Sequence, residues 1–405
     1  MNQMLRTPPA LPASVAFAGQ RGEFRRLARR GALLELVTVG FYRFWLATDI
    51  RRHLWSHTSV DGDGFEYTGR ARELLIGFLF ALAIVVPIYL AYFLAGLEAE
   101  RFKAFASFPL VAFFYVFGQF AIYRARRYRL TRTVWRGVRF WMTGSGWAYA
   151  ARAALWALLL PLTLGLVLPW REAALERYKM RHSHYGDLQG RFEGRGGEFF
   201  KRGIWIWLVA VVAVLVLFLA VPLTQSLPAL LPMAQAMTFA AVFVLLIGAP
   251  FLYAAFRAVE WRWWISGIRF GDVRLESELP RNALSGIYWK VIGWYLLIAV
   301  LFGTYLALCA ALAASLGETT MANIFVASHL LGYIPMLVAM GIGYLGFILA
   351  LNVVMRVYLL RDLWARLLGS TAVYGLEAAA NVAASGDLAS ALGEGLADGL
   401  DVAGF

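Results

Sequence analysis

Long apolar segments alternate with short basic segments rich in aromatic residues along the whole chain. Six apolar segments hold few or no charges and are about 20 residues or longer, the length that a helix needs to cross the hydrocarbon layer of a bilayer. They are residues 74–96, 104–123, 203–224, 236–256, 286–314 and 331–355. Short connectors join them in pairs, so the pattern predicts three spanning helical hairpins.

Two further apolar segments contain a Thr-x-Gly sequence and have arginines on both sides. Between Arg30 and Arg43 there are 12 residues, or about 18 Å of helix against a hydrocarbon layer of about 30 Å. Between Arg152 and Arg171 there are 18 residues, interrupted by two prolines. We expect both segments, 31–47 and 153–170, to form re-entrant or interfacial helices on the cytoplasmic side. The alternative, in which both cross and give eight spans, stays open because the charge rule has exceptions.

Short stretches of alternating polar and apolar residues follow the basic clusters. Each surrounds a glycine turn, the pattern typical of a β-hairpin. They are residues 58–67, 138–149, 183–193 and 268–276. The sequence therefore predicts an all-α polytopic membrane protein with six spanning helices in three hairpins, two re-entrant or interfacial helices and small cytoplasmic β-hairpins.

Composition and charge support this class and orient the chain. Hydrophobic residues make up 60% of the sequence and charged residues 16%, which excludes an ordinary water-soluble domain. Lys and Arg gather in the loops between the hairpins, whereas the connectors within hairpins hold only Arg101 and Lys103. By the positive-inside rule, the basic loops and both chain ends are expected in the cytoplasm. Cys309 is the single cysteine, so a disulfide within the chain is excluded.

The sequence contains internal repeats. "FAGQRGEF" at 17–24 matches "FEGRGGEF" at 192–199, with identical residues at an offset of 175. We divide the chain into a first repeat (1–146), a second repeat (147–285), a third helix pair with a basic end (286–370) and an acidic Gly/Ala-rich tail (371–405). Leucines recur every four residues between Leu388 and Leu400, so the tail forms either a weak amphipathic helix or a solvated end.

Three strings of the first repeat resemble a known family. "TVGFYRFW" (38–45), "RRHLW" (51–55) and "SVDGDGFEYTG" (59–69) are similar to the YjgN-like family of bacterial inner-membrane proteins, a family of unknown function. The resemblance covers about 17–285 and fades through 366. It implies an inner-membrane location and supplies no reaction. The second Thr-x-Gly segment departs from the pattern, with Leu166 and Val167 where the first has aromatic residues.

The sequence contains few residues in a pattern typical of a catalytic or metal-binding site. The pair His53 and His57 has the i, i+4 spacing of metal ligands on a helix, but no acidic partner motif accompanies it. No phosphate-binding loop, nucleophile elbow or zincin motif is present. We therefore predict no catalytic site, metal or cofactor, and not an enzyme. The polar residues in mid-span are Gln119, Thr304 and Asn352, which disfavours proton-coupled transport.

The arginines and aromatic residues that follow the apolar segments are the candidate site. They act either as an interface belt that orients the chain or, in addition, as ligands for anionic lipid head groups. The candidate lipid-binding residues are Trp45, Arg51, Arg52, Arg126, Arg127, Arg129, Arg132, Trp135, Arg177, Lys179, Trp261 and Arg262. The net charge of +13 sits beside apolar segments rather than on a polar domain, so membrane lipids, in particular anionic ones, are the expected partners and nucleic acid is not.

Two functions agree with these features. The first is an inner-membrane protein for transport or lipid handling. The alternative is a structural or partner-binding envelope protein that uses its basic cytoplasmic face to bind anionic lipid. The sequence does not indicate the oligomeric state.

Overall fold

Ten short strands close into one antiparallel barrel. The computed structural model describes residues 12–98, 103–226, 231–315 and 330–388, and the statements below concern these residues. Each strand pairs with the next one in the sequence, and β1 pairs with β10 to close the barrel. The strands are β1 (Ala13–Phe17), β2 (Thr58–Val60), β3 (Asp63–Tyr67), β4 (Thr133–Trp135), β5 (Val138–Met142), β6 (Ser183–Tyr185), β7 (Leu188–Phe192), β8 (Ile268–Phe270), β9 (Val273–Ser277) and β10 (Thr371–Tyr374).

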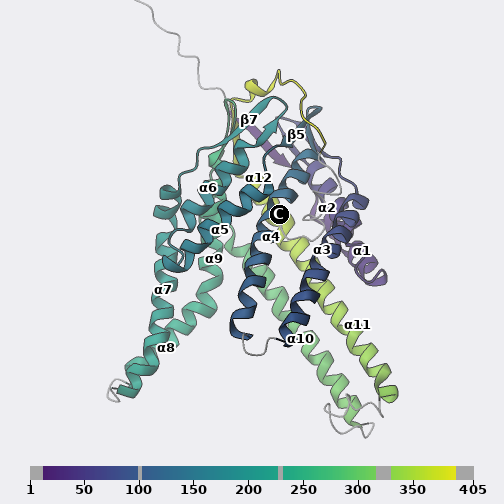
Figure 1. Cartoon of the computed structure of the whole chain (residues 1–405), viewed down its shortest axis with the longest axis vertical. Coiled ribbons are helices and arrows are strands. Elements are labelled where there is room, and N and C mark those ends of the chain that lie inside the picture. Colours follow the sequence, from purple (N-terminus) through teal and green to yellow (C-terminus); the bar gives the residue numbers. More distant parts are fainter. Residues whose placement is uncertain (1–11, 99–102, 227–230, 316–329, 389–405) are drawn as a thin grey trace, which may run out of the picture.

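At one end of the barrel, helical segments connect β1 to β2, β3 to β4, β5 to β6, β7 to β8 and β9 to β10. From β1 to β2 the chain forms α1 (Arg21–Val37) and α2 (Arg43–Ser56); from β3 to β4, α3 (Ala71–Glu98) and α4 (Lys103–Thr131); from β5 to β6, α5 (Gly146–Leu162) and α6 (Leu168–Arg181). From β7 to β8 it forms α7 (Gly196–Ser226), α8 (Leu231–Phe243), the π-helix η3 (Val244–Gly248) and α9 (Ala249–Gly267). From β9 to β10 it forms α10 (Ser285–Ser315), α11 (Leu330–Val354), the π-helix η5 (Met355–Leu360) and α12 (Arg361–Leu368), and a 3-10 helix, η6 (Leu376–Ala379), follows β10. The long helices extend away from the barrel and splay apart (Figure 1).

Five helices in the described part of the chain are long and apolar enough to cross a membrane, not the six that the sequence predicts. They lie within Ala71–Phe93, Gly196–Leu219, Pro232–Gly267, Ser285–Leu312 and Met336–Leu368. The sixth predicted segment, 104–123, forms the first part of α4, whose second half carries Arg124, Arg126 and Arg127. In the most apolar stretch of each of the five helices, at most 17% of the residues are buried by the protein.

The predicted all-α fold class is wrong, because the strands are not separate small hairpins. Phe65 of β3 pairs with Trp135 of β4, and Phe140 of β5 with Tyr185 of β6. These contacts join each hairpin to the next across long helical insertions, and β1 meets β10 across almost the whole chain. Alternation of polar and apolar residues within one strand shows which face of the strand is buried, but not which distant strand lies beside it. The barrel could therefore not be predicted from the sequence of each strand.

One predicted hairpin is also shifted. The second hairpin comprises 133–142 rather than 138–149, and its turn is Arg136–Gly137, both at positive φ (47° and 75°). This is the geometry of the two-residue turns that suit the twist of antiparallel strands. Gly144, which the sequence suggested as the turn, lies after β5 instead, with φ of 82°.

The two Thr-x-Gly segments form helix–turn–helix units with the same turn. Val39 and Gly40 have φ of 50° and 88°, and Leu164 and Gly165 have φ of 50° and 81°. The hydroxyl of Thr38 donates to the Leu34 carbonyl at 2.7 Å and accepts from the Tyr42 N–H at 2.9 Å. Thr163 makes the equivalent bonds to Leu159 and Val167. The threonine thus ends one helix and begins the next, so the chain returns to the barrel.

Side chains fill the barrel. Val60, Trp135, Tyr185, Val273 and Val373 are buried in one apolar cluster, and Leu376 and Ala379 of η6 pack against it. The predicted tail therefore starts with a barrel strand and a 3-10 helix, while its remainder, 389–405, lies outside the described residues.

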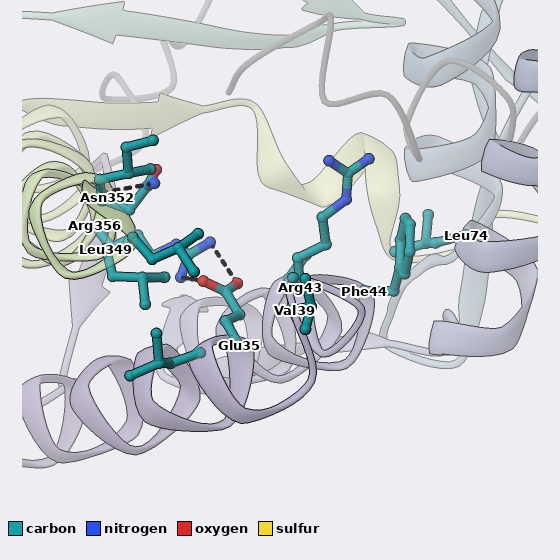
Figure 2. A pocket seen from close by; sticks show the side chains of 13 residues that line it. Glu35, Val39, Arg43, Phe44, Leu74, Leu349, Asn352 and Arg356 are labelled. Atoms are coloured by element: carbon teal, nitrogen blue, oxygen red, sulfur yellow. Dashed lines mark hydrogen bonds and ion pairs between the residues drawn. The ribbon is translucent and has the colours of Figure 1, made fainter. Parts of the chain in front are cut away.

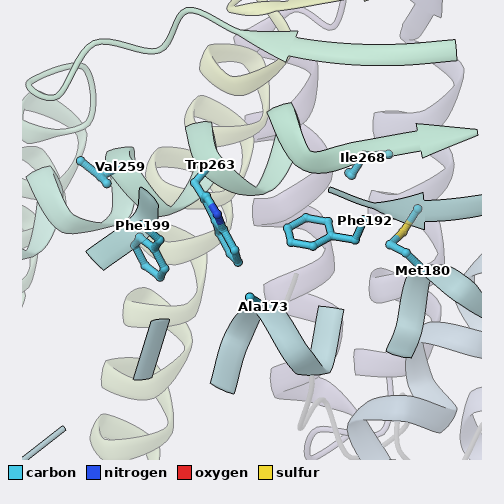
Figure 3. Packing of buried hydrophobic residues seen from close by; sticks show 7 residues of the cluster. All are labelled: Ala173, Met180, Phe192, Phe199, Val259, Trp263 and Ile268. Atoms are coloured by element: carbon cyan, nitrogen blue, oxygen red, sulfur yellow. The ribbon is translucent and has the colours of Figure 1, made fainter. Parts of the chain in front are cut away.

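A second apolar cluster lies where the barrel meets the helices. Trp263 of α9 stacks on Phe199 of α7, with ring centroids 4.8 Å apart, and meets Phe192 of β7 edge-on at 5.0 Å. Figure 3 shows these rings between α6, α9 and the strands. Phe24, which matches Phe199 in the sequence repeat, is likewise buried, in an apolar cluster against which Phe17 of β1 packs. The matched residues therefore anchor the helices to the barrel.

Candidate functional site

The candidate residues lie mainly on the last turns of the helices that lead into β2, β4, β6 and β8. We call residues 48–57, 123–132, 173–182 and 258–267 the collar, because they surround the end of the barrel from which the helices leave. Ten of the twelve predicted residues belong to it. Trp45 and Trp135 do not: Trp45 lies nearer the tip of the α1–α2 hairpin, and Trp135 belongs to β4.

Part of the collar is a buried ion-pair network rather than a surface. The Nε of Arg132 donates to the Oε2 of Glu73 at 2.9 Å, and the hydroxyl of Tyr128 donates to the same oxygen at 2.8 Å. Arg132 is 5% exposed, and its guanidinium lies over the Tyr128 ring, 5.2 Å from the centroid. Arg51, also buried, donates to the Tyr67 hydroxyl at 3.3 Å. These arginines join α2, α3 and α4 to the barrel.

A second buried network centres on Glu176. Arg126 donates to its Oε2 at 2.9 Å, and the ammonium of Lys179 contacts its Oε1. Burial by itself raises the pKa of Glu176, but the charges of Lys179 and Arg126 outweigh it and lower the pKa to about 2. The carboxylate stays ionised at neutral pH. Arg126 therefore stabilises the contact between α4 and α6, while Lys179 pairs with Glu176 within α6.

Four of the five remaining arginines of the candidate set share one position relative to the following strand. Arg52, Arg127, Arg177 and Arg262 each lie six residues before the first residue of the following strand, at Thr58, Thr133, Ser183 and Ile268 (58 − 52, 133 − 127, 183 − 177, 268 − 262). Arg52, Arg177 and Arg262 are exposed, while Arg127 is half-buried. Arg52 donates to the Gly69 carbonyl at 2.9 Å. These residues present positive charge around the outside of the collar.

The aromatic candidates and Arg129 have different surroundings. Trp45 is 38% exposed and stacks on Tyr42, whereas Trp135 is buried in the barrel and donates to the Asp63 carbonyl at 3.2 Å. Trp261 is half-buried and meets Trp264 edge-on. Arg129 is half-buried and its Nε donates to the Ala125 carbonyl at 3.4 Å. Of the three tryptophans, Trp45 is the most exposed.

A pocket lies between the α1–α2 hairpin and α11, and the sequence did not indicate it. Its volume is about 310 Å³, and its lining includes Glu35, Arg43, Asn352 and Arg356 among apolar side chains. Arg356 donates to both oxygens of Glu35, at 2.9 and 3.2 Å (Figure 2). Figure 2 shows Arg43 pointing away from this pair, and its guanidinium lies over the rings of Phe44 and Phe78, 4.8 and 4.5 Å from their centroids.

Sequence reasoning named Arg126, Arg132 and Lys179 and missed their carboxylate partners Glu73 and Glu176. It named neither member of the Glu35–Arg356 pair as a candidate. A signal existed for Glu73, because "GRAREL" at 69–74 ends in an acid and an apolar residue like "GQRGEF" at 19–24. No such signal marked Glu35 or Glu176. In the described part of the chain, no group of three His, Cys, Asp or Glu residues is arranged to hold a metal ion.

Together these features define a class of protein in which helices of membrane-crossing length extend from one end of a closed β-barrel. The chain belongs to the family described as bacterial proteins of unknown function (DUF898), whose model matches residues 12–399. The resemblance to the YjgN-like family is thereby confirmed, since the two names denote one family. No curated protein and no solved structure matches the chain.

Proposed function

We propose that the protein is a multi-pass protein of the bacterial inner membrane that handles anionic lipid of the cytoplasmic leaflet, with both chain ends in the cytoplasm. The observation that carries this proposal is the set of exposed arginines Arg52, Arg177 and Arg262, which occupy one shared position at the end of the barrel where the apolar helices begin. Guanidinium groups at this level meet the phosphate layer when the helices cross a bilayer.

The lengths of the helices support insertion of the short hairpins into one leaflet. Helix α2 has 14 residues and α3 has 28, so the short hairpin extends about 21 Å from the barrel and α3 about 42 Å. The side chains near the two tips, including Val37, Val39 and Leu164, are apolar and largely exposed. Apolar side chains of this kind are stable when lipid covers them.

Lipid handling is favoured over solute transport by the packing of the barrel. Trp135, Tyr185 and their neighbours occupy its interior, so the barrel offers no polar path along its axis. The spanning helices, in contrast, are little buried by the protein, which leaves their sides to lipid. The proposal needs neither a catalytic step nor a cofactor.

The lipid part of the proposal is tested in nanodiscs of defined phosphatidylcholine and phosphatidylglycerol content. We expect wild type to retain phosphatidylglycerol preferentially on native mass spectrometry. Each exposed collar arginine contributes about 1 kcal/mol of attraction, so Arg177→Gln should reduce the preference about fivefold and Arg52→Gln/Arg177→Gln/Arg262→Gln further. Arg274→Gln, on β9 near the opposite end of the barrel, is the matched control and should have no effect.

A second readout separates lipid handling from a structural or partner-binding role. In proteoliposomes that contain a fluorescent phosphatidylglycerol, a lipid-handling protein accelerates the movement of the probe between leaflets or between vesicles. Retention of the lipid without accelerated movement favours the structural role instead. A protein that shows no preference for phosphatidylglycerol and moves no lipid contradicts the proposal.

The orientation is tested by labelling engineered cysteines. With Cys309→Ala as background, Ser56→Cys and Gln189→Cys place a thiol at the collar and on β7. We expect neither thiol to react with an impermeant reagent in intact cells and both to react after lysis. Labelling of either position in intact cells places the barrel outside and overturns the proposed topology.

A further inference from the structure

We infer that the side chains of Arg21, Lys290 and Arg361 form a site for the phosphate group of one anionic phospholipid, where α1, α10 and α12 meet. The inference rests on the proposed function, because it assumes that the long helices cross a bilayer. The exposed collar arginines attract anionic lipid in general. This site adds one place at which a single lipid is held.

Three cations converge on one buried carboxylate, that of Asp362 on α12. The Nε and a terminal nitrogen of Arg21 donate to its two oxygens, at 3.3 and 2.8 Å, and Arg361 donates to its Oδ1 at 3.0 Å. The ammonium of Lys290 lies 3.7 Å from its Oδ2. The side chain of Asp362 is 6% exposed. The three cations therefore share a single anion that is covered by the protein.

The cluster holds more positive than negative charge. Asp362 balances one of the three cations. Glu23, an exposed residue of α1, lies within electrostatic range of the same His53 ring as Arg361, so its carboxylate offsets at most one more. Within the cluster at least one positive charge remains, and like charges held this close repel unless a further anion joins them. The head group of an anionic phospholipid supplies such a charge.

Two of the cations are open to the surroundings, whereas the carboxylate lies beneath them. The side chains of Arg21 and Lys290 are 49% and 41% exposed. At 3.7 Å the Lys290 ammonium is too far from Asp362 for a hydrogen bond, and it makes none with any other residue that the structure describes. A phosphate oxygen on the outer side can therefore accept from Lys290 without displacing Asp362.

The site lies at the level expected for the phosphate layer of the bilayer. Lys290 is five residues, or about 8 Å, into the apolar span of α10 (290 − 285). Long basic side chains near the ends of spanning helices reach back to the interface. Arg21 is the first residue of α1, four residues after the end of β1 (21 − 17). Both cations are thus near the barrel rather than in mid-membrane.

Aromatic rings continue the site towards the hydrocarbon. The Lys290 ammonium lies 5.9 Å from the centroid of the Tyr358 ring, and Tyr358 stacks on Trp294 with centroids 5.6 Å apart. Trp294 follows Lys290 by one turn of α10 and is 39% exposed. Tryptophan rings are enriched at the membrane interface. A free anion would use the cations alone, whereas a phospholipid uses the cations and these rings.

The cluster occupies the helical segment whose collar position has no arginine. The residue six positions before β10 is Ala365 (371 − 365), whereas the other four segments have Arg52, Arg127, Arg177 and Arg262 at this position. The fifth segment instead carries Asp362, which binds cations from two neighbouring helices. The fifth position around the barrel thus has a discrete cluster where each of the others has a single arginine.

The experiment uses native mass spectrometry of the full-length protein in detergent, with phosphatidylglycerol or phosphatidylcholine as the added probe. We expect wild type to retain one phosphatidylglycerol and no phosphatidylcholine. Lys290→Gln removes one cation and should weaken this binding about fivefold. Its unfolding temperature should stay close to that of wild type, because the Lys290 ammonium makes no hydrogen bond with the residues that the structure describes.

The matched control removes one positive charge from another face of α1. Arg26 is exposed and lies five residues after Arg21, about 140° around the helix. Arg26→Gln should leave the retained phosphatidylglycerol unchanged. Binding as tight in Lys290→Gln as in wild type overturns the inference, and so does an equal loss in Arg26→Gln and Lys290→Gln.

A second variant and a competitor separate a lipid from a free anion. Trp294→Ala should also weaken the retention of phosphatidylglycerol, because the lipid loses its contact with the ring. Inorganic phosphate at high concentration should not displace the lipid. Displacement by phosphate, or unchanged binding in Trp294→Ala, would show that the site takes a free anion and would overturn the lipid assignment.

The collar variant Arg52→Gln/Arg177→Gln/Arg262→Gln separates this inference from the proposed function. It should lose the general preference for phosphatidylglycerol but keep the single retained lipid, and Lys290→Gln should show the reverse. If wild type shows the general preference but retains no single lipid, the inference fails while the proposed function stands. Absence of both from wild type overturns both.

Discussion

Arg356, at the start of η5, donates hydrogen bonds to both oxygens of Glu35 on α1, across 321 residues of sequence. Glu35 is 4% exposed, so its negative charge has been removed from water and depends on this partner. The pair ties the short α1–α2 hairpin to one of the helices that are long and apolar enough to cross a membrane. It also lines the pocket between the α1–α2 hairpin and α11.

Removal of one member of this pair should destabilise the protein strongly. Glu35→Gln leaves the Arg356 guanidinium without its counter-ion in a largely apolar site, and the expected cost is about 3 kcal/mol. The double variant Glu35→Gln/Arg356→Gln should regain part of this loss, because no unpaired charge remains. Thermal unfolding in detergent measures both. A double variant whose loss equals the sum of the single losses would show that the two residues do not interact.

Arg132 and Arg177 represent the two kinds of arginine in the collar, the buried and the exposed. Arg132 is buried and bound to Glu73, whereas Arg177 is exposed. Arg132→Gln should therefore lower the free energy of unfolding by about 3 kcal/mol, and Arg177→Gln by less than about 0.5 kcal/mol. The lipid preference should respond in the opposite order. Equal effects on stability would contradict the division into buried and exposed arginines.

The ion pairs of Glu176 make stability depend on acid pH. Its pKa in the folded protein is about 2, against the ordinary value of 4.5 for a glutamate. A lowered pKa contributes stability that is complete above about pH 4.5 and is lost as the pH falls towards 2. The difference in unfolding temperature between wild type and Glu176→Gln should thus be largest above pH 5 and shrink below about pH 4. A difference that stays constant down to pH 3 would place the carboxylate outside this network.

The sequence predicted the helices well because their signals are local. The apolar lengths, the Thr-x-Gly turns and the Asp61–Gly62 turn each depend on residues close together in the chain. The barrel was missed because its strands have three to five residues each, and the pairing of Phe65 with Trp135 or of Ala13 with Val373 depends on chain segments brought together only by folding. Local alternation carries no record of such pairing.

The candidate site was only partly predicted, because the contacts between its residues also form only on folding. A cluster of arginines in the sequence shows where positive charge gathers, but it does not show which members meet a carboxylate. Arg132 and Arg126 meet Glu73 and Glu176, which come from α3 and α6. Only the exposed residues, such as Arg177, keep the surface position that lipid binding needs. The pocket was missed because Glu35 and Arg356 lie at opposite ends of the chain.

Trp135 and Trp45 provide the last test, because both were candidates for the membrane interface and the structure places them differently. Trp135 is 5% exposed in the barrel, so Trp135→Ala should leave a cavity and cost about 3–5 kcal/mol of stability. Trp45 of α2 is 38% exposed, and Trp45→Ala should cost at most about 1 kcal/mol. In nanodiscs, quenching by brominated lipid reports depth: a tryptophan-depleted protein that keeps only Trp45 should be quenched, and one that keeps only Trp135 should not. Quenching of Trp135 alone would mean that lipid reaches the barrel interior and would contradict the packed core.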